Sequence, residues 1–238
     1  MQIIEQKPNQ ITFRAEISES LANAIRRHIN QIPILAIDEV EIVKNDSALY
    51  DETVAHRIGL IPLKMDKSVS EKTEMDMSLS AKGEGFVYSG KFTGGLGVVY
   101  DKLPITYLEE EQELQLVAHA KTGRGVEHSK FSPGFLYYRN VSEIKIDADL
   151  YDEFKKICPN NEVKKEGKSI IIHDNLKIEV SDVCEEICRK NNRKLEITPK
   201  NELVITVESV GQLDVKDVFL KSVDALQKDL DLISKKVK

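Results

Sequence analysis

At the start of the chain, apolar residues recur first at every second position and then at helical spacing. Residues 11–17 alternate between apolar and polar side chains, which is the pattern of a half-buried β-strand. Ser18 follows as a candidate N-cap, and the apolar residues from Leu21 to Ile32 lie three or four positions apart. Pro33 ends this pattern. The sequence therefore predicts a strand followed directly by a helix.

The middle of the chain is dominated by the two-residue periodicity of β-strands. A strand over residues 34–44 carries apolar residues on both faces, and alternating segments separated by turns rich in Gly, Lys, Asp and Glu continue from about 47 to 146. The pattern changes at residues 147–200, where two short helices flank a strand and a hairpin over 194–207 follows. We therefore expect a β-rich domain and then a small α+β insert.

The last part of the chain predicts one long helix. Gly211 breaks the preceding strand, and Asp214 can cap a helix that continues to the final residues. At about 1.5 Å per residue, such a helix reaches roughly 35 Å. A chain divided into small units offers little core for an apolar stripe of that length, so we expect a partner chain to bury it; the alternative is an internal core helix. The stripe consists of Val215, Val218, Phe219, Val223, Leu226, Leu230, Ile233 and Val237.

Composition and charge exclude several classes of function. The 238 residues are 41% hydrophobic and 31% charged, as in a folded globular protein. A formal net charge of -6 disfavours independent nucleic-acid binding, which usually needs a basic excess. No apolar run is long enough to predict a membrane span, and the N-terminus lacks the apolar core of a signal peptide. Together with a small, odd number of cysteines, which suits a reducing compartment, these features predict a cytoplasmic protein.

Charged residues cluster between positions 21 and 63. An enzyme could use such carboxylates with a histidine as acid–base or metal groups, but the segment contains no HExxH motif, no paired-histidine ligand set and no nucleophile elbow. Two interpretations remain, a solvated surface and a docking surface on which arginines meet carboxylates of another protein. We favour docking. The residues lie on a helix, on the next strand and on a short helix: Arg26 and Arg27, Asp38 and Glu39, and His56 and Arg57.

Three ordered motifs give the chain a specific resemblance. The first comprises NAIRRHI, AIDEVEI and AHRIGLIPL within residues 21–63, the second is AHAKTGRGVEHSKFSP at 118–133, and the third is LVITVESVGQLDVKDVFLKSVDALQ at 203–227. Together they resemble the D subunit of archaeal RNA polymerase. That family is similar to the third subunit of eukaryotic RNA polymerase II and to the N-terminal region of the bacterial alpha subunit. The motifs span nearly the whole chain.

The resemblance implies an α+β fold with a discontinuous domain organisation. Residues 1–40 and 201–238 would form a dimerisation domain of strands and two long helices. A β-rich domain at residues 41–147 and a small ferredoxin-like α+β domain at 148–200 would be inserted within it. We expect strand–helix units at both ends of the chain for this reason.

The resemblance also implies a non-catalytic assembly subunit. Such a subunit pairs with a smaller one, called L in archaea, and the dimer carries the large subunits in which nucleotide addition occurs with magnesium held elsewhere. DNA is reached only through the assembled complex, and no membrane is involved. The alternative is a homodimeric platform, as in the bacterial alpha subunit. The implied partner contacts are Arg26, Arg27, Asp38, Glu39, His56 and Arg57 toward the large subunits, and Phe219, Val223, Leu226 and Leu230 toward the dimer partner.

The cysteines leave two interpretations open. Many members of the family are similar to ferredoxins in the small insert and hold an iron–sulfur cluster there. Cys158-Pro159 matches the family's Cys-Pro, but Cys184 and Cys188 are separated by three residues rather than two and no fourth cysteine follows. The three thiolates could hold a 3Fe–4S cluster, which would make the chain an iron–sulfur-binding, redox-responsive assembly subunit, or they could hold a zinc together with His173. We favour thiols that pack inward, and expect no cofactor.

Overall fold

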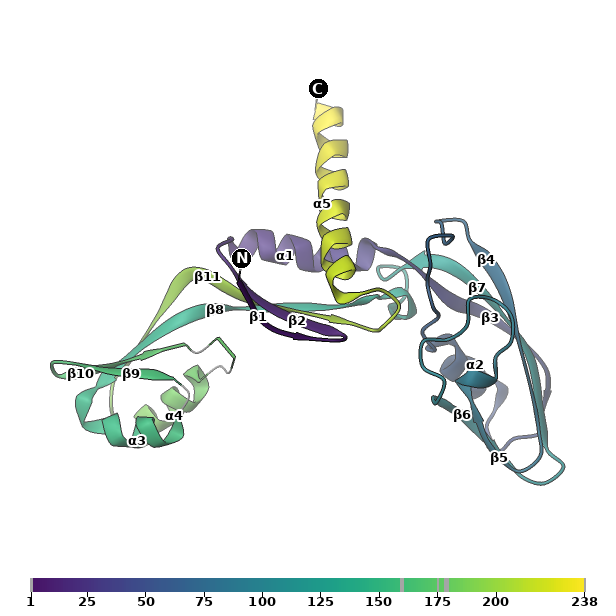
Figure 1. The fold of residues 1–238 in the computed structure, drawn as a ribbon, viewed down its shortest axis with the longest axis horizontal. Coiled ribbons are helices and arrows are strands. Elements are labelled where there is room, and N and C mark those ends of the chain that lie inside the picture. Colours follow the sequence, from purple (N-terminus) through teal and green to yellow (C-terminus); the bar gives the residue numbers. More distant parts are fainter. Residues whose placement is uncertain (1, 159–160, 175, 178–179, 238) are drawn as a thin grey trace. The chain divides into compact units, whose positions relative to one another are not determined.

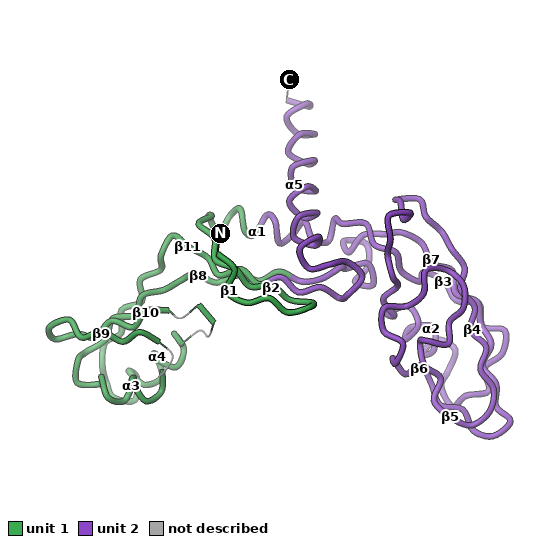
Figure 2. The backbone as a smooth tube through the Cα atoms, in the orientation of Figure 1, with its two compact units in different colours: residues 1–23, 136–206 green, residues 24–135, 207–238 purple. Residues whose placement is uncertain are grey.

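The computed structural model describes residues 2–158, 161–174, 176–177 and 180–237, so Pro159 and Lys238 lie outside the described residues. Its fold is mixed α+β (Figure 1). The chain divides into two compact units, each assembled from distant segments of the sequence (Figure 2). Unit 1 contains residues 1–23 and 136–206, and unit 2 contains residues 24–135 and 207–238.

A six-stranded sheet forms the framework of unit 1. Its strand order places the N-terminal strands beside a strand from near the C-terminus, in the order β1-β2-β11-β8-β10-β9. Side chains reinforce this long-range pairing, since the hydroxyl oxygens of Thr12 and Thr206 lie 3.1 Å apart and Arg14 forms an ion pair with Glu202 at 2.5 Å. The bounds are β1 Gln2–Lys7, β2 Gln10–Ala15, β11 Leu195–Ser209, β8 Gly134–Asp147, β10 Ser169–His173 and β9 Glu162–Glu166.

The small core of unit 1 lies between two helices and the end of this sheet. Helices α3 (Tyr151–Ile157) and α4 (Ser181–Lys190) pack on β8 and β10, and Phe154 is completely buried among them. The predicted helix–strand–helix order of this region is confirmed. The buried residues are Ile144, Ile146, Leu150, Phe154, Cys158, Ile170, Ile172, Cys184, Ile187 and Cys188.

Helix α1 (Glu19–His28) follows β2 directly, as the sequence predicts. The hydroxyl of Ser18 accepts a hydrogen bond from the backbone N–H of Leu21 at 3.2 Å, which satisfies one of the free donors at the helix start. A 3-10 turn, η1 (Ile29–Gln31), ends the helical region two residues before Pro33. With ten residues α1 is of ordinary length and is not the second long helix that the resemblance implies; among the described helices only the C-terminal one is long.

The main core of unit 2 lies between a three-stranded sheet, a two-stranded sheet and one helix. Strand β7 (Glu113–Arg124) is central and pairs with β3 (Pro33–Asn45) and β4 (Glu74–Lys82). Strands β5 (Gly85–Tyr88) and β6 (Pro104–Leu108) form the second sheet, and α2 (Asp51–Gly59) lies against β3 and β6. Alternate positions of these strands point inward, so the predicted period of two is confirmed for β4 and β7.

The C-terminal helix α5 (Val215–Val237) begins where the sequence predicts. The Asp214 carboxylate accepts a hydrogen bond from the backbone N–H of Lys216 at 2.9 Å, which is the N-cap contact. In the first two turns Val215, Val218 and Ser222 are buried. We call residues 215–225 the inner half of α5 and residues 226–237 the outer half.

One predicted element is wrong. The sequence indicates a hairpin over residues 194–207, but β11 runs as one continuous strand through Pro199. Proline fixes a backbone φ close to the extended range and lacks an N–H, so it is tolerated in a strand where no ladder donor is needed at its position. The residues around Pro199 are exposed, and the strand passes through them without turning.

Candidate functional site

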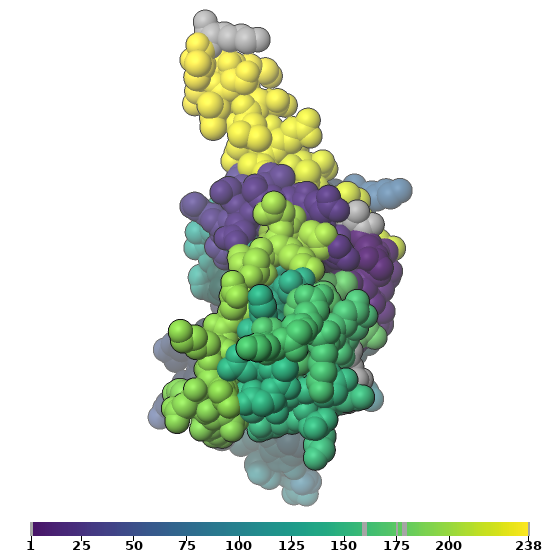
Figure 3. Space-filling view, turned by 90° about the vertical axis from the view of Figure 1, so that its left-hand side faces the viewer, coloured from purple at the N-terminus to yellow at the C-terminus, as the bar shows by residue number. Residues whose placement is uncertain are grey.

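The outer half of α5 carries an apolar stripe that its own unit does not cover. Leu230 is 56% exposed, Ile233 59% and Val237 82%. These residues lie three or four positions apart and therefore on one helix face. Figure 3 shows the last turns of α5, in yellow, projecting as a column of side chains. Large apolar side chains on one exposed face are typical of a protein–protein contact.

The predicted dimer contacts on α5 differ in their exposure. Phe219, Val223 and Leu226 are half-buried, whereas Leu230 is exposed. The stripe thus becomes progressively less covered toward the C-terminus. The structure places all four residues on the same side of the helix, since their spacings are three and four residues.

A histidine links α1 to α5 within unit 2. The Nδ1 of His28 lies 2.7 Å from the carbonyl oxygen of Ala24, and its Nε2 lies 3.2 Å from the Asp229 carboxylate. Both neighbours can accept a hydrogen bond from the imidazole ring. The helical spacing of residues 21–32 gives no indication of this polar contact, because Asp229 lies 201 positions away from His28.

The predicted arginine and histidine contacts lie on two helices. Both Arg26 and Arg27 are exposed on α1, so neither shares its buried face. His56 and Arg57 are exposed on α2, and Arg57 Nη2 donates a hydrogen bond of 2.6 Å to the carbonyl oxygen of Pro104. These side chains lie on the exposed surface of their helices.

Asp38 is neutralised inside the chain. Lys121 and Lys130 each place their Nζ 2.6 Å from one of its carboxylate oxygens. These two hydrogen bonds hold the pKa of Asp38 below its usual value. Sequence reasoning assigned Asp38 to a partner and missed the lysines, because Lys130 is 92 residues away. Its neighbour Glu39 is exposed.

The loop that follows β7 is clamped against the end of α1. The hydroxyl of Ser132 bonds the side-chain oxygen of Asn30 at 3.0 Å, and the backbone N–H of Val126 donates to the Asn30 carbonyl at 3.2 Å. Two glycines permit this approach. A Cβ on Gly125 would lie 2.5 Å from Asn30, and one on Gly123 would lie 2.6 Å from the Phe131 ring. Close packing therefore explains the two glycines of the motif at residues 118–133.

His119 lies beside a surface cavity of about 340 Å³ lined largely by charged residues of β3, β4 and β7. Its Nδ1 is 2.7 Å from the Asp76 carboxylate, and its Nε2 is 3.7 Å from that of Glu41. The hydrogen bond to Asp76 is the main cause that raises the pKa of His119. The imidazole and the carboxylates thus form a local charge network on the surface.

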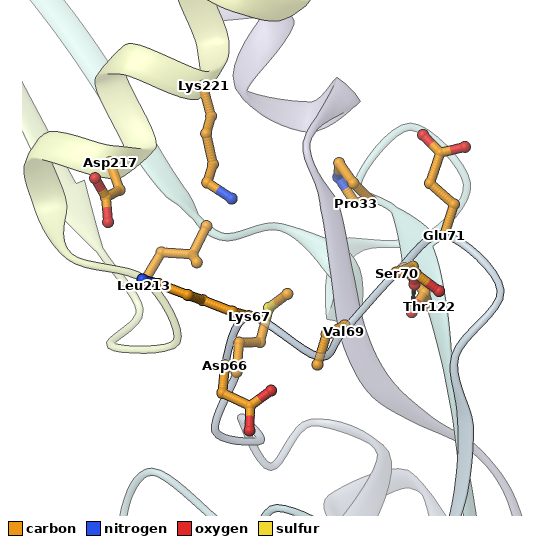
Figure 4. A pocket seen from close by; sticks show the side chains of 11 residues that line it. Pro33, Asp66, Lys67, Val69, Ser70, Glu71, Thr122, Leu213, Asp217 and Lys221 are labelled. Atoms are coloured by element: carbon orange, nitrogen blue, oxygen red, sulfur yellow. Dashed lines mark hydrogen bonds between the residues drawn. The ribbon is translucent and has the colours of Figure 1, made fainter.

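A larger groove of about 490 Å³ lies between the start of α5 and the segment 65–71 (Figure 4). The Lys221 side chain points into it from α5, and Met65, Val69 and Leu213 supply apolar surface. Its lining includes neither histidine nor cysteine, so it offers no nucleophile paired with a base of the usual kind. The mixed lining suits contact with another polypeptide.

The three cysteines lie together in the small core of unit 1. All are buried, and burial raises the pKa of each thiol, to about 12 for Cys184. Metal-bound sulfur is a thiolate, which this apolar setting disfavours. Within the described residues no group of three His, Cys, Asp or Glu side chains is arranged to hold a metal ion. As placed, the donor set does not fit an iron–sulfur cluster, and the expected absence of a cofactor stays a prediction.

None of the described helices combines the length and the apolar character needed to cross a membrane. This finding agrees with the absence of a long apolar run in the sequence.

Known proteins are similar to this chain over almost its full length. The sequence model of the family described as RNA polymerase Rpb3/RpoA insert domain matches residues 29–149. DNA-directed RNA polymerase subunit Rpo3 of Thermococcus kodakarensis is 34% identical over 96% of this chain and 94% of its own length. The Rpo3 subunit of Pyrococcus furiosus is 34% identical over 97% of this chain and 94% of its own length, and that of Archaeoglobus fulgidus is 29% identical over 99% and 96%. The chain therefore belongs to the Rpo3 family of archaeal DNA-directed RNA polymerase subunits.

Proposed function

We propose that the chain is the D subunit of an archaeal RNA polymerase and acts in transcription as an assembly subunit without a catalytic centre of its own. It heterodimerises with the smaller subunit L, and the dimer is the platform on which the large catalytic subunits are fixed. DNA is contacted through the assembled enzyme. The family membership supports this role, and so does the charged and apolar character of the surfaces described above.

The observation that carries the proposal is the apolar stripe on the outer half of α5. Burying one Leu, Ile or Val side chain contributes about 1.5–3 kcal/mol. The burial of three such side chains by a partner therefore outweighs the free energy lost when a few surface contacts are broken on binding. An isolated chain gains nothing from exposing them. Subunit L covers the stripe in this proposal, with Phe219, Val223, Leu226 and Leu230 at the contact.

The proposal assigns the remaining surfaces to the large subunits. Arg26, Arg27, Glu39, His56 and Arg57 are exposed and supply the charged contacts. Asp38 acts behind this surface, because its ion pair with Lys130 holds the loop after β7 against β3, while its ion pair with Lys121 joins β3 to β7.

The proposed domains are those indicated by the sequence. Residues 1–40 and 201–238 form the dimerisation domain, 41–147 the β-rich domain and 148–200 the small ferredoxin-like insert. No cofactor is bound, and the protein works in the cytoplasm as part of the polymerase. The contact between His28 and Asp229 in unit 2 supports the assignment of α1 and α5 to one dimerisation domain.

The experiment that tests the proposal is size-exclusion chromatography with light scattering on the full chain, on subunit L of the same organism and on their mixture. We expect a stable complex of one chain with one copy of subunit L. A homodimer that persists when subunit L is added would favour an alpha-like platform instead. A compact monomer that ignores subunit L and the large subunits would contradict the assembly role altogether.

A further inference from the structure

A second exposed apolar surface lies far along the chain from α5, on the β5–β6 ribbon of unit 2. Alternate residues of β5 point outward, while β6 has a register irregularity opposite Val87 and Tyr88, and three exposed side chains of the ribbon are aromatic. Phe86 is 55% exposed, while Tyr88 and Tyr107 are each 38% exposed. We call these three side chains the aromatic face. The opposite side of the ribbon carries Val87 and Ile105, which are buried in the main core of the unit.

The rings of the aromatic face are held in a defined arrangement. Phe86 lies directly opposite Tyr107 in the antiparallel register, with ring centroids 5.1 Å apart and an edge-to-face angle of 77°. Phe86 and Tyr88 have centroids 5.8 Å apart. Aromatic pairs at such distances attract each other, and the buried side of the ribbon fixes their backbone. The face is therefore preorganised and needs little ordering when a partner binds.

Two carboxylates act on Tyr107, one of the three rings. The Tyr107 hydroxyl donates a hydrogen bond of 3.1 Å to the Glu84 carboxylate, and the nearby charges of Glu84 and Glu109 help to raise the pKa of Tyr107. In the part of the chain that the structure describes, neither Glu84 nor Glu109 forms an ion pair. The faces of aromatic rings are themselves electron-rich. A cation is thus the missing electrostatic complement.

We propose that the aromatic face is a docking site for an arginine-bearing segment of another protein, with the guanidinium stacked on Phe86 and Tyr107 and hydrogen-bonded to Glu84. A guanidinium fits both features, because it is planar, weakly hydrated, stacks on rings and pairs with carboxylates. An aliphatic segment would desolvate the Glu84 carboxylate without supplying a cation to balance its charge, because its hydrogen bond from Tyr107 comes from a neutral hydroxyl. A nucleic acid could stack its bases here, but Glu84 and Glu109 would repel its phosphates. This site is separate from the α5 stripe and does not depend on the partner proposed there.

The test uses the full chain with ¹³C-labelled Phe and Tyr rings and titrates two probes, the peptide Gly-Arg-Gly-Arg-Gly with blocked ends and the same peptide with citrulline in place of arginine. Citrulline keeps the shape of arginine but carries no charge. We expect saturable shifts of the Phe86 and Tyr107 ring signals with the arginine peptide, and none with the citrulline peptide. A lysine version should bind at least threefold more weakly.

Three variants separate the aromatic face from general attraction to an acidic protein. Phe86→Leu keeps apolar bulk but removes the ring, and Glu84→Gln removes the charge; each should weaken binding at least threefold. Tyr50→Leu is the matched control, since Tyr50 lies directly before α2, is 82% exposed and is not part of the aromatic face, so its loss should change nothing. Equal binding by Phe86→Leu and the unaltered chain, equal binding of the citrulline peptide, or no saturation up to millimolar peptide would each overturn the proposal. Stacking of a single-stranded oligonucleotide on the same rings, with no response to the arginine peptide, would also overturn it.

Discussion

The two halves of α5 share one amphipathic pattern and have different surroundings. In the inner half, Val215 and Val218 are buried against their own unit. In the outer half, Leu230, Ile233 and Val237 lie on a continuation of the apolar side of the helix and remain mostly exposed. The same pattern therefore has two outcomes in one helix. The pattern shows that a face must be covered, and only the tertiary structure shows whether the chain covers it itself.

The largest expected effect comes from placing charge on the outer half. The double variant Leu230→Glu with Ile233→Glu should weaken binding to subunit L by about 100-fold or more, because two buried apolar contacts become buried charges. The fold of the isolated chain should not change, since both side chains are exposed in it. Isothermal titration calorimetry with subunit L measures the loss of affinity, and a thermal melt of the free chain measures whether its stability is unchanged.

Leu232→Glu is the control for this prediction. Leu232 is 56% exposed, as is Leu230, but two residues of helix rotation place it on the opposite face. It should keep most of the affinity. Equal losses for both faces would mean that the stripe as defined is not the contact.

The next largest effect is a difference between the two halves of α5 in how much a substitution lowers the free energy of unfolding. Val218→Ala should lower the free energy of unfolding of the isolated chain by about 2 kcal/mol, because it removes buried methyl groups and leaves a cavity. Leu232→Ala should change it by less than about 0.5 kcal/mol, as surface substitutions usually do. Urea denaturation followed by circular dichroism gives both values. Comparable losses would show that the outer half is packed within the free chain.

The cysteine thiols, like the inner half of α5, are buried by their own chain, and this burial can also be measured. Burial raises the pKa of Cys184 to about 12, so this thiol stays neutral and unreactive in the folded protein at neutral pH. We expect Ellman's reagent to label it only after unfolding. Because the folded pKa lies above the ordinary value of 9.0, the folded state should lose stability as the pH rises above about 9. Rapid labelling of the native chain at Cys184 would contradict the buried core.

The smallest effect concerns the surface network at His119. Its hydrogen bond with Asp76 raises the pKa of the imidazole, so the charged form is favoured by folding. The stabilisation is fully present below the ordinary pKa of 6.5 and is lost as the pH rises through the folded value. The melting temperature of the unaltered chain should therefore exceed that of His119→Gln near about pH 5 and equal it near about pH 9. A difference that does not vary with pH would point to packing instead.

Local features of the fold are readable from the sequence because their partners are near in the chain. Ser18 bonds the N–H three residues on, and Asp214 bonds the N–H two residues on, so both caps are predicted correctly. The continuous strand β11 is missed because Pro199 suggests a turn, although proline also fits an exposed strand.

The candidate site is less predictable, because its decisive contacts are remote in sequence. The neutralisation of Asp38 by Lys130 and the link between His28 and Asp229 join residues that no periodicity connects. The outer half of α5 is likewise exposed because no other described part of the chain covers it, which its own sequence pattern cannot show. Motifs such as AHRIGLIPL identify the family, while the division of charge between internal pairs and free surface needs the structure.

The most direct test of the account is hydrogen–deuterium exchange along α5, measured by mass spectrometry on the isolated chain and on the assembled polymerase. In the isolated chain we expect slow exchange in peptides from the inner half and fast exchange in those from the outer half. In the polymerase both should exchange slowly, because another chain covers the stripe. Fast exchange of residues 230–237 in the assembled enzyme would contradict the claim that this stripe is where the subunit binds its partner.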